Sequence, residues 1–387
     1  MENKRNIVKK PGLKTLSIHH GESFSEETGC VMPPIFSTST FKHGNKGNFD
    51  YTRSGNPNFK ILENILKSIE ETEYCTVFGS GISAVTAISS TLKSGDKILC
   101  ESNLYGCTVR MFEKIFKKFG INVLYTDFTN KNNLKKISDL NPTLIWLESP
   151  TNPLLKVLDI KLICDEANKF EIPVVVDNTF STALIQKPLE LGATLSLIST
   201  TKFINGHSDA LGGAVLTNNE RWNSKMIFSQ KALGLQPSPF DSWLITRGVK
   251  TLPLRIEQQT KSAELISEEL ENHQLISKVI YPFNRKHPQF NLAKSQMKSG
   301  GSMITLKLNL NQEDTFKFCK SLKYFSLAES LGGVESLSCH PATMTHASVD
   351  DKTKKLLGID DALIRLSIGC EDTKDLISDI LFALDKF

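Results

Sequence analysis

The sequence lacks several patterns that would assign it to a specialised class of proteins. None of its eight cysteines lies in a CxxC pair, and no Cys/His cluster has zinc-ligand spacing. No stretch approaches the roughly 18 uncharged apolar residues of a membrane span. The basic N-terminal segment has no apolar core of the kind found in signal peptides. We therefore expect free thiols, no metal site, no membrane partner and a cytoplasmic location.

A strong charge of either sign is also absent. The chain has 46 Lys and Arg residues against 42 Asp and Glu residues, and the net charge of +4 is spread along the sequence. This balance does not favour nucleic acid or a membrane surface as the main partner. The 387 residues, 40% of them hydrophobic, contain no internal repeats or low-complexity tracts and are typical of a globular protein of two or three domains.

The pattern of apolar residues divides the chain into three parts. Residues 1–58 are rich in Gly, Ser, Thr and Pro with little periodicity, and we interpret them as an extended arm. In residues 59–250, amphipathic segments at 109–119 and 160–170 alternate with short apolar runs. These runs lie at residues 97–99, 122–125, 143–147 and 173–176, and they lack the strict alternation of half-exposed strands. Repeated β–α units of this kind predict an α/β domain with a mostly parallel sheet covered by helices.

The remaining residues, 251–387, have a different pattern. Residues 254–273 form one long amphipathic segment, which predicts a helix. In residues 302–310 apolar side chains alternate with others, which predicts an antiparallel strand with one exposed face. We therefore expect a smaller α+β C-terminal domain.

Polar side chains follow several of the predicted strands. Asp177 comes directly after the run Pro-Val-Val-Val, and Lys202 lies just beyond the run at residues 195–199. Ligands of open parallel sheets bind beyond the carboxyl ends of the strands. Pyridoxal phosphate (PLP) requires a lysine that forms a Schiff base and a carboxylate that keeps the pyridine nitrogen protonated. Taken singly, Lys202 is equally well a solvated loop residue and Asp177 a turn or helix cap, but their order at strand ends favours a PLP site.

The phosphate of such a cofactor needs a cradle of donors. Residues 78–83, Phe-Gly-Ser-Gly-Ile-Ser, precede a helical stretch at 84–92. Glycines let the backbone approach an anion, and the first amides of a helix point toward it. Ser199 and Thr201 could add hydroxyl donors.

The same glycines permit a second interpretation. Gly79-x-Gly81-x-x-Ala84 matches a loose dinucleotide fingerprint, and Glu101 ends the next predicted strand about twenty residues on. This layout is typical of an NAD-binding oxidoreductase. It leaves Asp177 and Lys202 without a role.

Longer motifs make the sequence recognisable. The run Ser-Thr-Thr-Lys-Phe-Ile-Asn-Gly-His-Ser-Asp at residues 199–209 closely resembles the lysine segment of the Cys/Met-metabolism PLP enzymes, the trans-sulfuration family. The resemblance covers about residues 12 to 385 and extends, in the same order, to residues 29–35, 50–57, 105–106, 148–153, 177–180, 328–333, 341–347 and 364–367. It implies the aspartate-aminotransferase-like fold of type I, with PLP as cofactor and amino acids as substrates.

The resemblance implies roles for individual residues. Lys202 is expected to carry the Schiff base and to move protons between substrate carbons, Asp177 to pair with the pyridine nitrogen, and Tyr105 to stack on the ring and assist at the γ-leaving group. Phosphate binding is expected from Ser199, Thr201 and the amides of Gly81 and Ile82. The substrate carboxylate is expected to bind Arg365, with Asn152 and Ser330.

Two further residues are expected to act across a subunit boundary. In this family the residues at Tyr51 and Arg53 reach the phosphate site of the neighbouring subunit. A complete site then implies at least a dimer, and the family is usually tetrameric.

The specific reaction depends on fewer residues. Glu329 resembles the cystathionine γ-synthase and γ-lyase pattern and could hold a distal amino group; methionine γ-lyase typically lacks this acid, and cystathionine β-lyase fits less well. Ser54 replaces an arginine that enterobacterial synthases use for a succinyl group, which leaves acetyl or phospho esters of homoserine, or cystathionine itself. Arg110 is a possible contact of a distal carboxylate, or a surface residue of a helix. We interpret the chain as a cystathionine γ-synthase of methionine biosynthesis, with γ-lyase as the alternative, to which Pro237-Ser-Pro points.

A non-enzymatic binding protein with this fold is a further alternative. It predicts loss of Lys202 or Asp177, and neither is lost.

Overall fold

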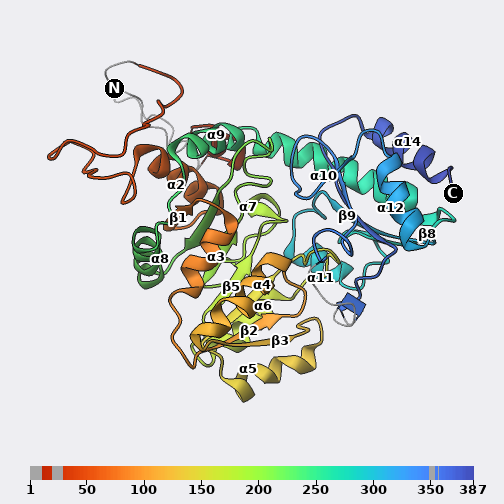
Figure 1. Cartoon of the computed structure of the whole chain (residues 1–387), viewed down its shortest axis with the longest axis horizontal. Helices are drawn as coiled ribbons and strands as arrows, with labels where there is room; N and C mark the ends of the chain where they lie inside the picture. The colour runs from red at the N-terminus through yellow and green to blue at the C-terminus, as the bar shows by residue number, and fades with distance from the viewer. Residues whose placement is uncertain (1–10, 20–28, 348–353, 356) are drawn as a thin grey trace, which may run out of the picture.

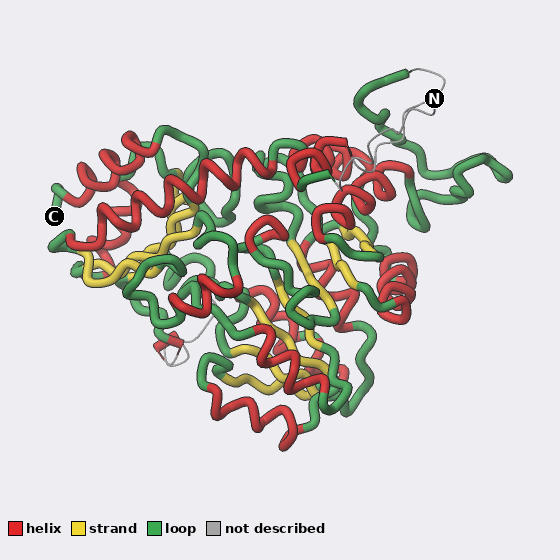
Figure 2. The backbone as a smooth tube through the Cα atoms, turned by 180° about the vertical axis from the view of Figure 1, so that it is seen from behind, coloured by secondary structure: helices red, strands yellow, loops and turns green. Residues whose placement is uncertain are grey.

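The computed structural model describes residues 11–19, 29–347, 354–355 and 357–387. These residues form a seven-stranded sheet and a five-stranded sheet. Figure 1 shows the two sheets side by side, with helix α10 (Leu252–Glu269) running from the larger sheet toward the smaller one. Figure 2 shows from behind that helices flank the strands of the larger sheet. The predicted α/β class, with a larger mostly parallel sheet and a smaller α+β unit, is confirmed.

The strands of the larger sheet are buried along nearly their whole length, which explains their apolar sequences. In spatial order they are β1 (Tyr74–Phe78), β7 (Gly213–Thr217), β6 (Leu195–Ile198), β5 (Val174–Asp177), β4 (Leu144–Glu148), β2 (Lys97–Glu101) and β3 (Asn122–Thr126). Only β7 runs antiparallel to its neighbours. The carboxyl ends of the other six strands therefore lie along one edge of the sheet.

Helices cover both faces of this sheet. One face packs against α3 (Gly81–Ser89), α4 (Gly106–Lys114) and α8 (Glu220–Ala232). The opposite face packs against α2 (Pro57–Glu70), α5 (Lys135–Leu140), α6 (Ile160–Asn168), α7 (Thr182–Ile185) and α9 (Pro239–Val249). The edge formed by the strand ends is left for a ligand.

All four predicted helices differ from their predicted bounds, and two of these differences lie near the strand ends. Helix α3 begins at Gly81 rather than at residue 84, because Ser80 accepts a hydrogen bond from the Ser83 amide and caps the helix there. The segment predicted as one helix at 109–119 is α4 followed by a short 3₁₀ turn, Phe116–Phe119, which ends at Gly120 in the left-handed conformation. Helix α3 and helix α4 (Gly106–Lys114) both begin three residues earlier than predicted, which brings their first residues closer to the strand ends.

The smaller sheet has the order β10 (Ser326–Leu327), β11 (Leu337–Cys339), β12 (Leu363–Ser367), β9 (Met303–Leu308) and β8 (Ile276–Ile280). Its core includes α10, α12 (Gln312–Ser321) and α14 (Thr373–Leu384), and α11 (Phe290–Gln296) joins β8 to β9. The prediction that one face of β9 is exposed is wrong. Met303 packs into the core of the larger unit, and the buried Thr305 hydroxyl donates to the Pro153 carbonyl, so the larger unit covers this face.

The N-terminal segment is not a wholly extended arm. Leu13–His19 forms helix α1, whose Leu16 is buried and whose Lys14 pairs with Glu257 of α10. Residues 29–56 contain no helix, and one isolated bridge joins Thr40 to Tyr51. The boundary predicted at residue 250 remains a prediction, since Leu252 and Ile256 of α10 still pack into the core of the larger unit.

Membrane-spanning helices are not found in the described part of the chain: none of its helices is both long and apolar enough to cross a bilayer.

Helix α2 carries two acidic side chains on its inner face. Glu63 accepts a hydrogen bond from the Val77 amide, whereas neither carboxylate oxygen of the buried Glu70 has a hydrogen-bond partner among the described residues. Burial raises the pKa of Glu63 to about 7 and that of Glu70 to about 8, against the opposing effect of lysine charges. These acids make the fold less stable as the pH rises from their unfolded pKa through their raised folded pKa.

We predict that Glu70→Gln weakens the pH dependence of stability between about pH 5 and pH 8. An acid whose pKa is raised in the folded state stabilises the fold at low pH, and that contribution is lost as the pH rises from its unfolded pKa through its folded pKa. For Glu70 the contribution is roughly 5 kcal/mol. Urea unfolding of the apoprotein at several pH values measures how the free energy of unfolding changes with pH. Glu268→Gln on the exposed face of α10 is the control. Identical pH slopes in wild type and Glu70→Gln would contradict this account.

Candidate active site

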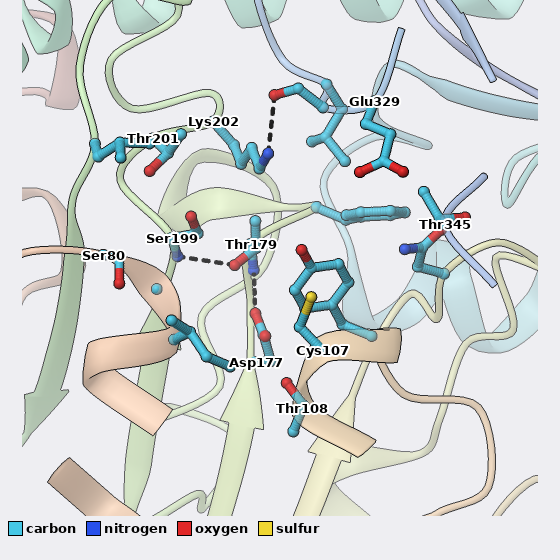
Figure 3. A pocket seen from close by; sticks show the side chains of 18 of the residues that line it. Ser80, Cys107, Thr108, Asp177, Thr179, Ser199, Thr201, Lys202, Glu329 and Thr345 are labelled. Carbon is cyan, nitrogen blue, oxygen red and sulfur yellow. Dashed lines mark hydrogen bonds between the residues drawn. The ribbon is translucent and has the colours of Figure 1, made fainter. Parts of the chain in front are cut away.

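A cavity of about 1140 Å³ opens at the carboxyl edge of the larger sheet. Its wall combines side chains at the ends of β4, β5 and β6 with side chains from the smaller unit. Figure 3 shows Asp177, Thr179, Ser199 and Lys202 on one side of this cavity and Glu329 and Thr345 on another.

The structure brings most of the predicted site residues to this cavity. The wall includes Gly81, Ile82, Tyr105, Arg110, Asn152, Asp177, Ser199, Thr201, Lys202, Glu329, Ser330 and Arg365. Tyr51 and Arg53 are not among the residues that line it. Tyr51 is exposed, and Arg53 donates to the Lys231 carbonyl oxygen at the end of α8 (2.9 Å).

Lys202 lies in a turn that follows β6. Its ammonium group donates to the hydroxyl of Ser330 (2.8 Å). Burial, assisted by the positive charge of Arg365, lowers the pKa of Lys202 to about 8. A lysine of this kind is deprotonated and nucleophilic in a much larger fraction of molecules than an exposed lysine.

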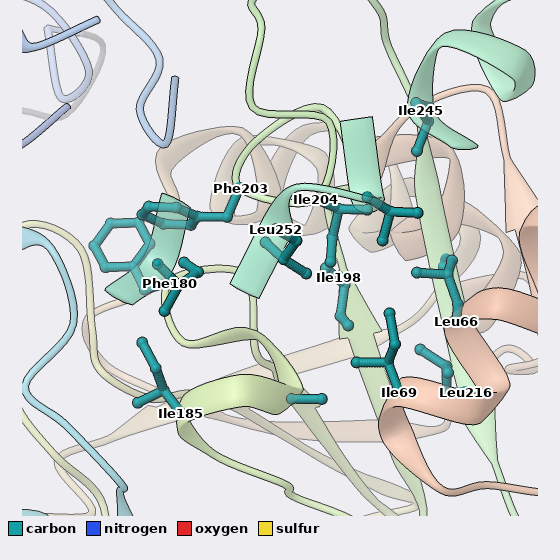
Figure 4. Packing of buried hydrophobic residues seen from close by; sticks show 14 of the residues in the cluster. Leu66, Ile69, Phe180, Ile185, Ile198, Phe203, Ile204, Leu216, Ile245 and Leu252 are labelled. Atoms are coloured by element: carbon teal, nitrogen blue, oxygen red, sulfur yellow. The ribbon is translucent and has the colours of Figure 1, made fainter. Parts of the chain in front are cut away.

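Hydrophobic packing and hydrogen bonds from Arg255 fix the backbone that follows Lys202. Phe203 and Ile204 point into the hydrophobic core beside Leu252 and Ile198 (Figure 4). The buried Arg255 of α10 donates to the carbonyl oxygens of Phe203 (2.7 Å) and Ile204 (3.1 Å). These contacts hold the turn so that Lys202 projects into the cavity.

Asp177 ends β5 and is buried at the floor of the cavity. Its carboxylate accepts a hydrogen bond from the Thr179 amide (3.0 Å). The Thr179 hydroxyl in turn accepts a hydrogen bond from the Ser199 amide (2.9 Å). Burial raises the pKa of Asp177 to about 6, opposed by the hydrogen bonds of Thr179. No ion pair to Asp177 is present among the described residues, so this carboxylate is available to a cationic group of a ligand.

The cradle is built where α3 approaches the turn after β6. A Cβ atom on Gly81 would lie only 2.8 Å from the Ser199 Cβ, so glycine is required for this approach. The first amides of α3 and the hydroxyl of Ser199 lie around the gap, which suits a phosphate group. Thr201 also lines the cavity, but its hydroxyl donates to the Gly212 carbonyl (3.1 Å). Together with Lys202 and Asp177, the donor set fits PLP.

Arg365 of β12 forms the opposite wall. It is buried, and its guanidinium donates to the Asn152 side-chain oxygen (2.9 Å) and the Ser330 carbonyl (2.8 Å). Burial lowers its pKa, and its Nε has no hydrogen-bond partner among the described residues. A buried guanidinium without a carboxylate partner is prepared for an anionic ligand.

Two charged side chains lie nearer the mouth of the cavity. Glu329 is exposed and precedes Ser330, whose φ of 94° is unusual for a residue other than glycine. Arg110 on α4 is also exposed, and its Nη2 lies 3.0 Å from the Cys107 sulfur. Both are accessible to the distal end of a substrate.

Sequence reasoning gave no role to several residues of this wall. Thr179 follows Asp177 by two positions inside a motif that had been recognised, and Thr345 lies in another. Glu148 is the first residue of the recognised motif at residues 148–153, but the sequence assigned it no role. Nothing in the sequence pattern singled out Cys107.

The dinucleotide interpretation does not fit this geometry. The Glu101 carboxylate is fully buried and accepts hydrogen bonds from Ser102, Asn103 and Phe128. It does not line the cavity, so it is not placed to bind a ribose there.

Comparison with known proteins agrees with the site. A family model described as Cys/Met metabolism PLP-dependent enzyme matches residues 14–385. Cystathionine gamma-lyase of Dictyostelium discoideum is 43% identical over 97% of this chain and 98% of its own length. Cystathionine beta-lyase of Lactococcus lactis subsp. cremoris is also 43% identical, over 97% and 99%. The crystal structure of cystathionine gamma synthase from Xanthomonas oryzae pv. oryzae in complex with cystathionine has a TM-score of 0.94 at 37% identity, over 97% of this chain and 98% of that chain.

We predict that Lys202 of the apoprotein reacts with an amine reagent with a midpoint near pH 8. A lysine whose pKa is lowered to about 8 is half deprotonated at that pH. Labelling with trinitrobenzenesulfonate from pH 6 to pH 11, read by mass spectrometry of peptides, measures the midpoint. The exposed Lys114 provides the reference in the same digest. A midpoint for Lys202 no lower than that of Lys114 would show that burial does not activate this amine.

Proposed function

The chain belongs to the Cys/Met metabolism PLP-dependent enzymes, and we propose that it cleaves L-cystathionine at the Cγ–S bond, giving cysteine, 2-oxobutyrate and ammonia. PLP is the cofactor. The observation that carries the proposal is that two side chains of opposite charge line the cavity, the buried Arg365 and the exposed Glu329. They suit a substrate with an amino-acid group at each end.

When bound, PLP supplies an electron sink that stabilises negative charge on the substrate α-carbon. Asp177 binds the pyridine nitrogen and keeps it protonated. Arg365, with Asn152 and Ser330, binds the substrate α-carboxylate through the guanidinium fork. Lys202, with its lowered pKa, removes the protons from Cα and Cβ, and it delivers a proton to Cγ after the Cγ–S bond has broken.

Two residues act at the far end of the substrate. The Glu329 carboxylate binds the distal ammonium group, which methionine lacks. Tyr105 lies on the cavity wall and assists departure of the γ-substituent. Burial and the nearby Cys107 and Glu329 raise the pKa of Tyr105, so its hydroxyl stays protonated near neutral pH and is a donor rather than a base.

The direction of the reaction rests on the relatives and on one sequence feature. The sequence interpretation placed cystathionine γ-synthase first, and synthase structures of 37% and 38% identity resemble this fold closely, including metB of Corynebacterium glutamicum. Curated relatives that are 40% to 43% identical over almost the whole chain are named lyases, two of them beta-lyases. Together with Pro237-Ser-Pro, these relatives favour cleavage, while Ser54 argues only against a succinyl ester as substrate. Synthesis of cystathionine from cysteine and an activated homoserine is the second candidate.

We also propose that the site is completed by a second copy of the chain. Among the described residues, the cations on the cavity wall are Arg110, Lys202 and Arg365, and none of them belongs to the cradle around Gly81. A phosphate dianion in this cradle therefore lacks a counter-charge from the same chain. Arg53, on an exposed segment outside the cavity, would supply this charge in a dimer, and Tyr51 would add a hydroxyl donor. Two such dimers would form a tetramer.

Substrate tests of the purified holoenzyme distinguish the two candidates. We expect 2-oxobutyrate and cysteine from cystathionine, and little cystathionine from cysteine with acetyl, phospho or succinyl esters of homoserine. Lys202→Ala should abolish both. The reverse pattern of products would establish the synthase. Glu329→Gln should lower kcat/KM for cystathionine by about ten-fold and leave elimination from O-acetylhomoserine, which has no distal amino group, unchanged. Equal losses on both substrates would contradict the role of Glu329.

Subunit mixing tests the shared site. Arg53→Ala and Lys202→Ala should each be nearly inactive alone. Mixed dimers should restore about a quarter of the sites, because half of the dimers are mixed and each of these has one intact site. Lys202→Ala mixed with Asp177→Ala is the control, since both residues come from the same chain and no intact site can form. Absence of recovery in the first mixture would show that Arg53 acts within its own subunit or not at all.

A further inference from the structure

Three neighbouring strands of the larger sheet end in a buried acid. They are Glu101 on β2, Glu148 on β4 and Asp177 on β5, and Glu148 is the register partner of Asp177. Burial raises the pKa of each. Asp177 has a proposed ligand and Glu101 lies outside the cavity, whereas Glu148 lines the cavity and has no role in the proposed reaction.

The two oxygens of Glu148 contact two different segments of the chain. Oε2 accepts a hydrogen bond from the Tyr105 amide at 2.7 Å, and Oε1 accepts one from the Asn152 amide at 2.8 Å. Tyr105 precedes α4 and makes no side-chain cap of its own. Asn152 lies in the loop after β4 and binds Arg365 through its side chain. A single carboxylate therefore lies between the segment that carries Tyr105 and the segment that orients the Arg365 guanidinium.

The position of Glu148 makes this contact rigid. The residue is the last of β4, which is buried along its whole length and paired with β2 and β5. Both oxygens of the Glu148 side chain are engaged, and the two distances, 2.7 Å and 2.8 Å, are short for N–H···O hydrogen bonds. The central strands of the sheet thus set the distance between Tyr105 and Asn152.

We propose that Glu148 is a positioning residue that fixes Tyr105 and Asn152 relative to each other, and so aligns the substrate anchor with the residue that faces the reacting end. This inference deepens the proposed function and concerns the same site. It gives Glu148 no contact with the reacting atoms. Its effect passes through the two backbone amides.

Glu101 provides a matched control in the same sheet. Its carboxylate is also buried at a strand end, and it also accepts two backbone amides, those of Asn103 and Phe128. Neither of these residues lines the cavity. Glu101→Gln therefore reports the general cost of altering a buried acid at this edge without moving the site.

Hydrogen exchange of the apoprotein, resolved at single amides, tests the contact directly. Glutamine keeps the volume of Glu148 but has only one acceptor atom at its end, so at least one of the two amides loses its partner. We expect exchange at Tyr105 or Asn152 to accelerate about ten-fold or more in Glu148→Gln. In Glu101→Gln the acceleration should be confined to Asn103 and Phe128. Unchanged exchange at both Tyr105 and Asn152 would overturn the proposal.

Ligand binding separates positioning from a purely structural role. L-Alanine has an α-carboxylate but no γ-substituent, and its binding to the holoenzyme is followed by the absorbance change of PLP. We expect its Kd to rise about ten-fold in Glu148→Gln and to stay unchanged in Glu101→Gln. An equal rise in both variants, or no rise in Glu148→Gln, would overturn the positioning role. Because alanine is not cleaved, this result does not depend on whether cystathionine is the substrate.

Glu148→Asp is the second variant in case the glutamine protein fails to fold. It keeps the carboxylate but shortens the side chain by one methylene, so it cannot reach both amides. The same selective changes in exchange and in alanine binding are expected, and their absence counts equally against the proposal.

Discussion

The parallel arrangement of β1, β2, β4, β5 and β6 is the constraint on which the site depends. Parallel strands must all end at the same edge, and helices cover both faces of this sheet. The residues at or just beyond the ends of these strands therefore come together at this edge. They are Ser80 and Gly81 after β1, Asp177 at the end of β5, and Lys202 after β6. The single antiparallel strand, β7, lies between β1 and β6 and is antiparallel to both, so β1 and β6 run in the same direction. The cradle and the lysine thus come from strands that are not neighbours but end at the same edge.

Burial of charged groups prepares this edge for ligands. Asp177, Lys202 and Arg365 are each removed from water, and each has a pKa moved in the direction that disfavours its charge. None of them forms an ion pair with another described residue. An isolated buried charge destabilises a fold, so a chain that keeps three in one cavity carries an energetic cost that ligands of opposite charge can offset. In the proposed function, the pyridine nitrogen and the substrate carboxylate are such ligands.

The smaller unit is tied to this edge by a compact set of contacts. Arg365 of β12 is the register partner of Thr305 on β9. The Thr305 hydroxyl donates to the carbonyl of Pro153, while Arg365 donates to the side chain of the adjacent Asn152. The loop after β4 therefore receives hydrogen bonds from two neighbouring strands of the other sheet. These bonds hold Arg365 on the cavity wall that lies opposite Lys202.

The sequence by itself determined the α/β class, the position of most strands of the larger sheet and the residues that follow them, because buried parallel strands have distinctive apolar runs and their motifs are long. It also determined the family, and with it PLP. Other features depend on contacts between distant residues. The covered second face of β9 and the helix Leu13–His19 are decided by packing against segments far along the chain. The early start of α3 at Gly81 is decided by the local Ser80 cap, which hydrophobic periodicity does not encode. The link from Glu148 to Tyr105 and Asn152 joins positions 43 apart and 4 apart in sequence. Only the tertiary structure brings these amides to one carboxylate, because the sheet fixes where β4 ends and the chain returns to that point twice.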